Sequence, residues 1–101
     1  MIEKQPAISV IMSTYREEEI FLCKAMESVL TQTFTDFEFL IAVDDPQNDA
    51  LIDILKEYAS RDQRVRLHIN KENIGLSASL NVLLEEATGE YIARMDADDI
   101  S

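Results

Sequence analysis

The feature that most constrains the fold of this chain is a regular alternation of strand-like and helix-like segments. Short apolar runs are each followed by a longer amphipathic stretch, and the unit recurs after roughly 27 residues. Alternation of this kind is typical of βα units, because parallel strands need a long crossover connection that is usually a helix. The sequence therefore predicts an α/β fold built on a mainly parallel sheet.

The predicted strands differ in how far they should be buried. The second is apolar nearly throughout, as expected for a strand covered on both faces, whereas the third alternates in polarity and is predicted to lie at an edge. His68 falls on the polar phase of the third strand, so we expect a surface histidine. We predict strands at 8–12, 37–43, 65–69 and 91–95, and helices at about 17–32, 48–60 and 77–88.

Each predicted helix has one apolar stripe that should face the sheet. The stripes are Leu22, Ala25, Met26 and Val29, then Leu51, Ile54, Leu55 and Tyr58, then Leu80, Leu83, Leu84 and Ala87. Asn48 or Asp49 is expected to cap the second helix. Ser77 is expected to cap the third, and Gly89 to follow its end as a left-handed residue. Cys23 lies within the first helical pattern and is expected to be buried and inert.

The composition limits the class of protein. The chain has 101 residues, of which 47% are hydrophobic, and its net charge is −11. These values fit one globular domain or part of a larger one, and the acidity argues against a nucleic-acid surface, which needs a basic patch. A single cysteine fits a reducing compartment, and no apolar run is long enough to span a membrane. We expect a cytoplasmic location, with any association with the inner face of the membrane depending on residues beyond Ser101.

Three carboxylates follow the last predicted strand, at Asp96, Asp98 and Asp99. Carboxylates this close repel one another unless a cation or a hydrogen-bond network lies among them. Mg²⁺ and Mn²⁺ prefer such oxygen ligands and usually share them with substrate phosphates. The segment therefore predicts a divalent-metal site that holds a diphosphate. The alternative interpretation is an acidic turn in an acidic protein.

Polar clusters follow all four predicted strands, and parallel strands would bring these clusters to one edge of the sheet, where such folds bind ligands. Tyr15 could instead cover the start of a helix, and Asp44 and Asp45 could form a turn before Pro46. The clusters are Ser13, Thr14, Tyr15 and Arg16, then Asp44, Asp45, Gln47 and Asn48, then Asn70, Asn73, Gly75 and Ser77, then Asp96, Asp98 and Asp99.

Five motifs occur together in an order that is typical of one family. They are ISVIMSTY at 8–15, LTQTF at 30–34, FEFLIAVDD at 37–45, NIGLS at 73–77 and GEYIARMDADD at 89–99. The pattern resembles the N-terminal half of the family 2 glycosyltransferases and covers nearly the whole chain. The resemblance implies the GT-A fold, a Rossmann-like three-layer α/β sandwich, for residues 1–101.

The resemblance implies an inverting enzyme that transfers a sugar from a nucleotide-diphosphate donor, with a UDP-sugar expected, to a glycan or glycoconjugate acceptor. Polysaccharide assembly is typical of the family. Asp98, together with Asp96, is implied to bind Mn²⁺ or Mg²⁺ on the diphosphate, where a metal stabilises the charge of the leaving group. The residues implied to bind the nucleotide are Ser13, Thr14, Tyr15, Asp44, Asp45 and Asp96.

The chain departs from the family pattern at three places. Arg16 replaces a usual Asn, Pro46 and Gln47 replace a usual Gly-Ser, and Leu80 stands where many members have Arg. The loop change puts the base selectivity in doubt. In the family, the acceptor site and the catalytic base come from the half that follows, so we expect a donor-binding part that is inactive alone. An uncovered sheet edge and apolar face also predict self-association.

Three other classes of protein stay open on the sequence. A non-catalytic nucleotide-sugar-binding module differs only in its downstream sequence. A receiver-like Mg²⁺-binding signalling domain would need its acidic pair after the first strand, whereas here acidic pairs follow the second and fourth strands. A nucleotidyltransferase usually has a Gly-rich basic loop after its first strand, and none is present. The absence of Gly-x-Gly-x-x-Gly argues against a dinucleotide-binding fold.

Overall fold

The computed structural model describes residues 5–96 and confirms the alternation of strands and helices. Each predicted element is present, with bounds that differ by a few residues at most of the helix ends. The elements are β1 (Ile8–Thr14), α1 (Glu19–Leu30), β2 (Phe37–Val43), α2 (Asp49–Arg61), β3 (Val65–Ile69), α3 (Leu76–Glu86) and β4 (Tyr91–Arg94).

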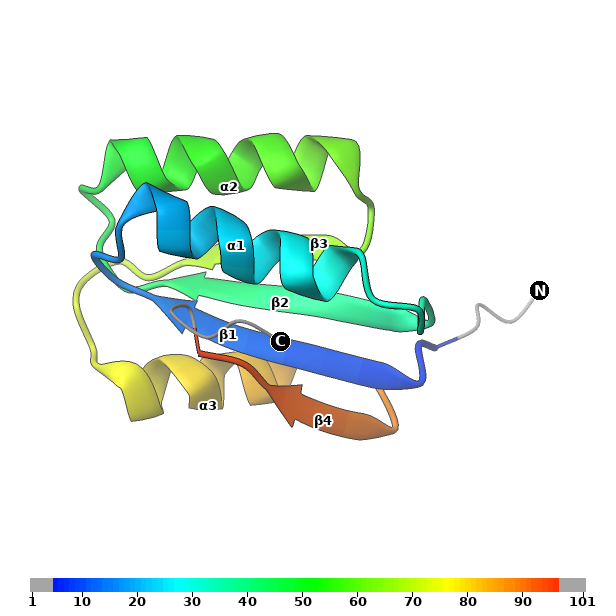
Figure 1. Ribbon diagram of the computed structural model, residues 1–101. Helices are drawn as coiled ribbons and strands as arrows, with labels where there is room; N and C mark the ends of the chain where they lie inside the picture. Colours follow the sequence, from blue (N-terminus) through cyan, green and yellow to red (C-terminus); the bar gives the residue numbers. More distant parts are fainter. Residues whose placement is uncertain (1–4, 97–101) are drawn as a thin grey trace.

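The strands form one parallel sheet in the order β3-β2-β1-β4. Figure 1 shows α1 and α2 over one face of the sheet and α3 over the other. The chain steps outward from β1 to β3, and α3 then carries it back past β2 and β1 to β4. The strand order therefore reverses between β1 and β4, which is where parallel α/β sheets bind ligands. The α/β class and the edge position of β3 are confirmed.

Alternate residues of the two central strands pack against different helices. Val10 and Phe39 belong to the larger core, which includes the buried sides of α1 and α2. Ile11, Leu40 and Ala42 pack with Leu80 and Leu83 of α3 in a smaller core. This division follows from the two-residue period of strands, since neighbouring side chains point to opposite faces. β2, which is apolar except for Glu38, is therefore covered on both faces, as predicted.

The helical stripes are largely as predicted. The stripe of α1 is buried at all four positions. In α2, Leu51 and Leu55 are buried, and Asn48 caps the helix by accepting a hydrogen bond from the Leu51 N–H at 3.3 Å. In α3, Leu84 is exposed, because the helix covers the sheet with a narrower face than the sequence suggested. Within the described part of the chain, no helix has the length and apolarity to cross a membrane.

The expected cap and end of α3 were wrong. The helix begins at Leu76 with Gly75 as its cap residue, so Ser77 lies inside the first turn. It ends at Glu86, and Gly89 does not adopt a positive φ; among the described residues only Gly75 does, at 91°. Cys23 is partly exposed rather than buried. His68 is at the surface as predicted, with its Nδ1 atom 3.2 Å from Glu86 Oε2.

Candidate functional site

The loops after the four strands meet at one edge of the sheet, on the left in Figure 1. Backbone hydrogen bonds extend the sheet into these loops. The Asp44 N–H donates to Thr14 O at 2.8 Å, the Asn70 N–H to Val43 O at 2.9 Å, and the Met95 N–H to Ile11 O at 2.9 Å. The first residue after each of β2, β3 and β4 is therefore held by a backbone hydrogen bond to the neighbouring strand. The predicted convergence of the polar loops at this edge is confirmed for the described residues, while Asp98 and Asp99 lie outside them.

Tyr15, Arg16 and Asp45 form one contact group at this edge. Arg16 Nε donates to Asp45 Oδ2 at 3.2 Å, and the guanidinium carbon lies 4.6 Å from the centroid of the Tyr15 ring. Asn48 Nδ2 donates to Tyr15 O at 3.2 Å and so connects the loops after β1 and β2. An aromatic face beside a carboxylate can stack on a planar ring and accept a hydrogen bond from it. Arg16 contacts both, a position that the sequence did not reveal.

Asp44 has a different environment from the adjacent Asp45. It is only 3% exposed. Its Oδ1 atom accepts hydrogen bonds from Asn70 Nδ2 and the Ile74 N–H, both at 2.8 Å, and its Oδ2 atom accepts from Asn73 Nδ2 and the Gly75 N–H, both at 2.9 Å. Burial alone would raise the pKa of Asp44, but these donors outweigh it and hold the pKa below the usual 3.8.

The contacts of Asp44 fix the loop at residues 70–75 against the end of β2. Asn70 also donates from Nδ2 to Ser79 Oγ at 2.9 Å, which ties the loop to α3. Thr14 is likewise turned inward, with its hydroxyl donating to Ala42 O at 3.1 Å, and Ser13 is only partly exposed in β1. The predicted contacts of Ser13, Thr14 and Asp44 with a nucleotide stay predictions. The observed contacts of Asp44 and Thr14 are internal to the protein.

Asp96 lies at the rim after β4 with its side chain about half exposed. Its Oδ1 atom accepts hydrogen bonds from Arg94 Nε at 3.2 Å and from Arg94 Nη2 at 3.0 Å. Asp98 and Asp99 lie outside the described residues. Within residues 5–96, no three His, Cys, Asp or Glu side chains converge as a metal site. Asp96 fits as one hard oxygen ligand at this rim, and its predicted metal and ribose contacts stay predictions.

A second buried carboxylate lies at the opposite end of the sheet. Glu38 Oε2 accepts from Ser9 Oγ at 2.5 Å and from the Thr88 N–H at 2.7 Å. The Gly89 N–H donates to Ser9 Oγ at 2.8 Å. Burial would raise the pKa of Glu38, but these hydrogen bonds lower it below 4.5. This network joins β1, β2 and the turn before β4, and it lies away from the candidate site.

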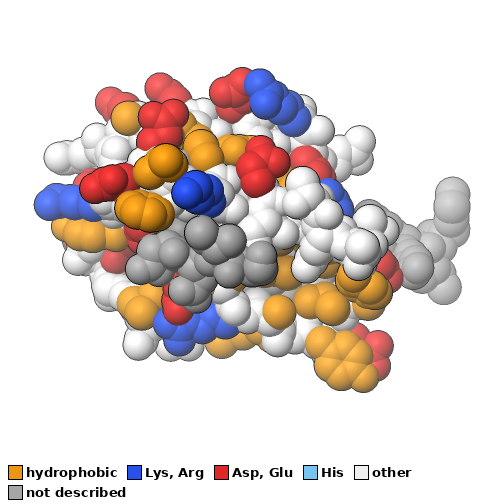
Figure 2. All heavy atoms as spheres, viewed as in Figure 1, with side chains coloured by type: hydrophobic (Ala, Val, Ile, Leu, Met, Phe, Trp, Pro, Cys, Tyr) orange, Lys and Arg blue, Asp and Glu red, His pale blue; other side chains and the backbone are white. Residues whose placement is uncertain are grey.

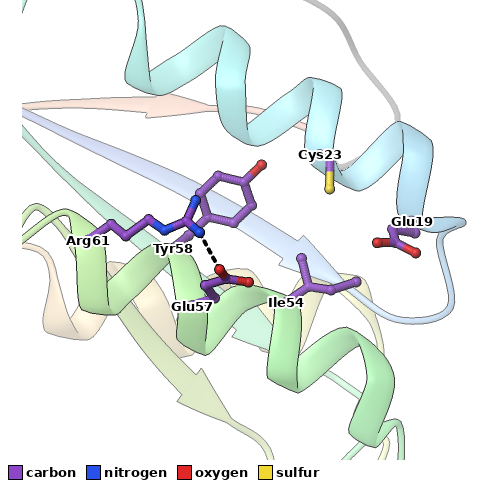
Figure 3. A pocket seen from close by; sticks show the side chains of 6 residues that line it. All are labelled: Glu19, Cys23, Ile54, Glu57, Tyr58 and Arg61. Atoms are coloured by element: carbon purple, nitrogen blue, oxygen red, sulfur yellow. Dashed lines mark hydrogen bonds and ion pairs between the residues drawn. The ribbon is translucent and has the colours of Figure 1, made fainter.

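A cavity of about 140 Å³ lies between α1 and α2, also away from the rim (Figure 3). Arg61 pairs with Glu57 on its wall, and the Tyr58 hydroxyl donates to Glu27 Oε1 at 3.0 Å. These polar groups have partners within the protein, so the cavity is not part of the candidate site. Its lining residues are Glu19, Cys23, Ile54, Glu57, Tyr58 and Arg61.

A known protein family matches nearly the whole chain. Residues 9–101 match the family described as glycosyl transferase family 2. The chain belongs to this family. Membership confirms the resemblance drawn from the motifs and decides against the receiver-like and nucleotidyltransferase alternatives. As a member of glycosyl transferase family 2, the chain has its acidic pairs after β2 and at the end of β4 rather than after β1.

Two relatives of this family 2 chain are similar over nearly all of it. An uncharacterized glycosyltransferase of Methanocaldococcus jannaschii is 43% identical over 97 residues, which is 96% of this chain and 33% of the relative. The putative glycosyltransferase EpsE of Bacillus subtilis is 45% identical over 97 residues, which is 95% of this chain and 34% of the relative. The chain thus spans about a third of the length of these curated relatives.

Solved structures confirm that the fold is of the GT-A type. The mannosyltransferase PcManGT from Pyrobaculum calidifontis, in complex with GDP-Man and Mn²⁺, superimposes with a TM-score of 0.83 at 23% identity, over 96% of this chain and 29% of that one. The TarS 1-349 protein of S. aureus, in complex with UDP-GlcNAc, gives a TM-score of 0.81 at 28% identity, over 92% of this chain and 27% of that one. The first likeness concerns the fold alone.

Proposed function

We propose that this family 2 chain supplies the donor site of an inverting, metal-assisted glycosyltransferase. The donor is a nucleotide-diphosphate sugar, with UDP as the nucleotide, and the acceptor is a glycan or glycoconjugate. The observation that carries the proposal is the arrangement of Tyr15, Asp45 and Asp96 on one rim, at the point where the strand order reverses.

The aromatic and carboxylate groups suit a nucleobase. The Tyr15 ring is 38% exposed and offers a face for stacking. Among the described residues, the hydrogen bond to Asp45 Oδ2 comes from Arg16, a highly exposed side chain that can move aside at little cost. The freed carboxylate oxygen would then accept the imino N–H of uracil. We assign the contact with the base to Asp45 rather than Asp44, because both carboxylate oxygens of Asp44 accept hydrogen bonds from the loop at 70–75.

The diphosphate needs a cation, because the chain has a net charge of −11. Asp96 and Asp98 would hold Mn²⁺ or Mg²⁺, both of which prefer carboxylate oxygens. Such a metal, when bound, neutralises charge on the departing diphosphate. The position of Asp96 after β4, at the same edge of the sheet as Tyr15 and Asp45, supports this role. Both hydrogen bonds from Arg94 go to the Oδ1 atom of Asp96.

The titles of the similar structures support this donor class without deciding the base. TarS was solved with UDP-GlcNAc, at 28% identity to this chain, and with UDP, at 27%, whereas PcManGT was solved with GDP-Man. A non-catalytic module that only binds a nucleotide sugar is the second candidate, because the chain spans about a third of its curated relatives. The proposal for the whole enzyme places the acceptor site and catalytic base in the remaining two thirds.

Calorimetric titration with UDP, in the presence and absence of Mn²⁺, tests the donor site. We expect metal-dependent binding that Asp98→Ala abolishes. Asp53→Ala is the matched control, because it removes the same charge from the exposed side of α2. A folded chain, verified by circular dichroism, that binds no UDP with Mn²⁺ would contradict the UDP donor site. Binding of GDP in its place would move the proposal to a guanosine donor and retain the site.

A further inference from the structure

Arg16 makes two contacts at the rim, one with a carboxylate and one with an aromatic ring. Its Nε atom donates to Asp45 Oδ2 at 3.2 Å, and its guanidinium carbon lies 4.6 Å from the centroid of the Tyr15 ring. The guanidinium is planar and delocalised, so it can lie against an aromatic face while an N–H at its edge meets a carboxylate. A planar group with an N–H donor therefore already occupies the space beside Tyr15 and Asp45.

A nucleobase would need the same two groups. In the proposed donor site, the base stacks on Tyr15 and donates a ring N–H to Asp45. The other carboxylate oxygen of Asp45, Oδ1, accepts the Gln47 N–H at 3.1 Å, so Oδ2 is the oxygen that Arg16 and a base would share. A base that takes both contacts cannot lie where the guanidinium lies, and binding of one therefore displaces the other.

The base-binding groups do not depend on Arg16 for their position. The Tyr15 N–H donates to Glu17 Oε2 at 2.7 Å, and Tyr15 O accepts from Asn48 Nδ2 at 3.2 Å. The carboxylate has its own backbone contact, as described above. The contacts of Arg16 add little, because its side chain is 68% exposed and because exposed ion pairs and cation–π contacts are weak. Removal of the guanidinium would therefore leave both groups in place.

We propose that the Arg16 guanidinium is an internal competitor of the nucleobase and thereby sets the affinity of the donor site. The inference rests on the proposed function, since it needs a base to bind at Tyr15 and Asp45. In the free protein the guanidinium fills the place of the base, and a nucleotide must displace it. Part of the favourable energy of base binding is then used to break the contacts of Arg16. The nucleotide product, which carries the same base as the donor, is held less tightly by the same factor.

An open groove beside the rim can receive the displaced side chain. The groove has a volume of about 450 Å³. Its lining residues are Arg16, Glu17, Glu18 and Phe21. Glu18 is exposed and makes no capping hydrogen bond to α1, so its carboxylate can pair with the guanidinium there. Figure 2 shows positively and negatively charged side chains at the left border of the molecule, where the loop between β1 and α1 lies in Figure 1. Arg16 would thus exchange the carboxylate of Asp45 for that of Glu18 and lose its contact with Tyr15.

Calorimetric titration of the parent and of Arg16→Gln with UDP and with inorganic diphosphate, each with Mn²⁺, tests the proposal. Inorganic diphosphate lacks a base, so it reports the effect of the lost positive charge alone. We expect the affinity for UDP relative to diphosphate to rise about three- to tenfold in Arg16→Gln, because base binding no longer breaks an exposed ion pair and a cation–π contact. Arg61→Gln is the matched control, since Arg61 is a similarly exposed arginine paired with Glu57 on α2, and it should leave the ratio unchanged.

The outcomes separate the role of Arg16 from the donor site itself. If UDP binds the parent, but its affinity relative to diphosphate is unchanged in Arg16→Gln, the competitor role is overturned and the donor site is retained. A lower relative affinity in Arg16→Gln would also overturn it, because that result would show that Arg16 contacts the bound base. UDP that binds neither the parent nor the variant would overturn the donor site and the competitor role together.

Nuclear Overhauser effects give a direct measurement on the unaltered chain. Cross-peaks between the Arg16 Cδ protons and the Tyr15 ring protons should be present in the free protein. Saturation with UDP should remove them, with Mg²⁺ used in place of the paramagnetic Mn²⁺. Saturation with inorganic diphosphate and Mg²⁺ should leave them, because diphosphate has no base to displace the guanidinium. Cross-peaks that persist at saturating UDP would overturn the displacement of Arg16.

Discussion

Gly89 lies so close to Ser9 that a Cβ atom at Gly89 would stand 2.5 Å from the Ser9 backbone nitrogen and 2.7 Å from the Ile8 carbonyl carbon. The Gly89 N–H donates to Ser9 Oγ at 2.8 Å across 80 positions of sequence. Ser9 in turn donates to the buried Glu38. Glycine at position 89 thus lets the turn before β4 approach β1 and close the network around Glu38.

Gly89→Ala should destabilise the protein by about 1–3 kcal/mol, because backbone atoms rather than a flexible side chain must move to admit the methyl group. Urea unfolding followed by circular dichroism measures the change. Adding Ser9→Ala to the same chain removes the hydroxyl contact but leaves the backbone contacts. Recovery of stability in that double variant would contradict the prediction, because it would show that the new methyl group clashes with the Ser9 hydroxyl rather than with the backbone.

Asp44→Asn should destabilise the protein by about 2–3 kcal/mol. In the parent both carboxylate oxygens accept hydrogen bonds, whereas the amide NH₂ of asparagine cannot accept one and would face N–H donors. Asp45→Asn is the control and should cost less than about 1 kcal/mol, because its partner Arg16 is highly exposed. Hydrogen exchange adds a local measurement. In Asp44→Asn the Ile74 and Gly75 amides should exchange faster, and unchanged protection there would contradict the assigned contacts.

Stability should fall in acid through Glu38 and Asp44. The pKa of Glu38 lies below 4.5 and that of Asp44 below 3.8 in the folded protein, despite the opposing effect of burial. When the pKa of a carboxyl group is lower in the folded than in the unfolded protein, its ionised form stabilises the folded state. This contribution is complete at pH values above the unfolded pKa and is lost as the pH falls through the folded pKa. Urea midpoints should therefore stay level near neutrality and drop below pH 4.5.

Glu38→Gln provides the control for this acid dependence. The glutamine side chain can still accept hydrogen bonds from Thr88, but it does not titrate. The variant should be less stable than the parent at neutral pH and should lose less stability on acidification. An acid dependence as steep as that of the parent would show that Glu38 does not contribute to it.

Tyr15→Ala should weaken UDP binding about tenfold if the donor site is as proposed, since stacking on a base contributes roughly 1–3 kcal/mol. Tyr15→Phe keeps the ring and should bind nearly as well as the parent. The free energy of unfolding should change little in either variant, because the ring is exposed. Equal UDP affinity for the alanine and phenylalanine variants would argue against stacking at Tyr15.

Features that depend on local periodicity were predictable from sequence. The α1 stripe was predicted at all four positions, and β2 was predicted with its observed bounds. The distinction between Asp44 and Asp45 was missed. The sequence signal for this distinction was the alternation along β2. Leu40 and Ala42 face α3, and the same phase directs Asp44 toward Asn70 and Ser79. Asp45, in the other phase, faces Arg16 and the open rim.

The sequence by itself determined the order and kind of the elements, the family and the clustering of polar loops at one edge. These follow from periodicity and motifs, which are written within short stretches of chain. The tertiary structure decided that Asp44 holds a loop, that Arg16 contacts both Tyr15 and Asp45, and that Gly89 serves a close approach to Ser9. Each of these depends on contacts between residues far apart in the chain, whose distances exist only once the sheet has assembled.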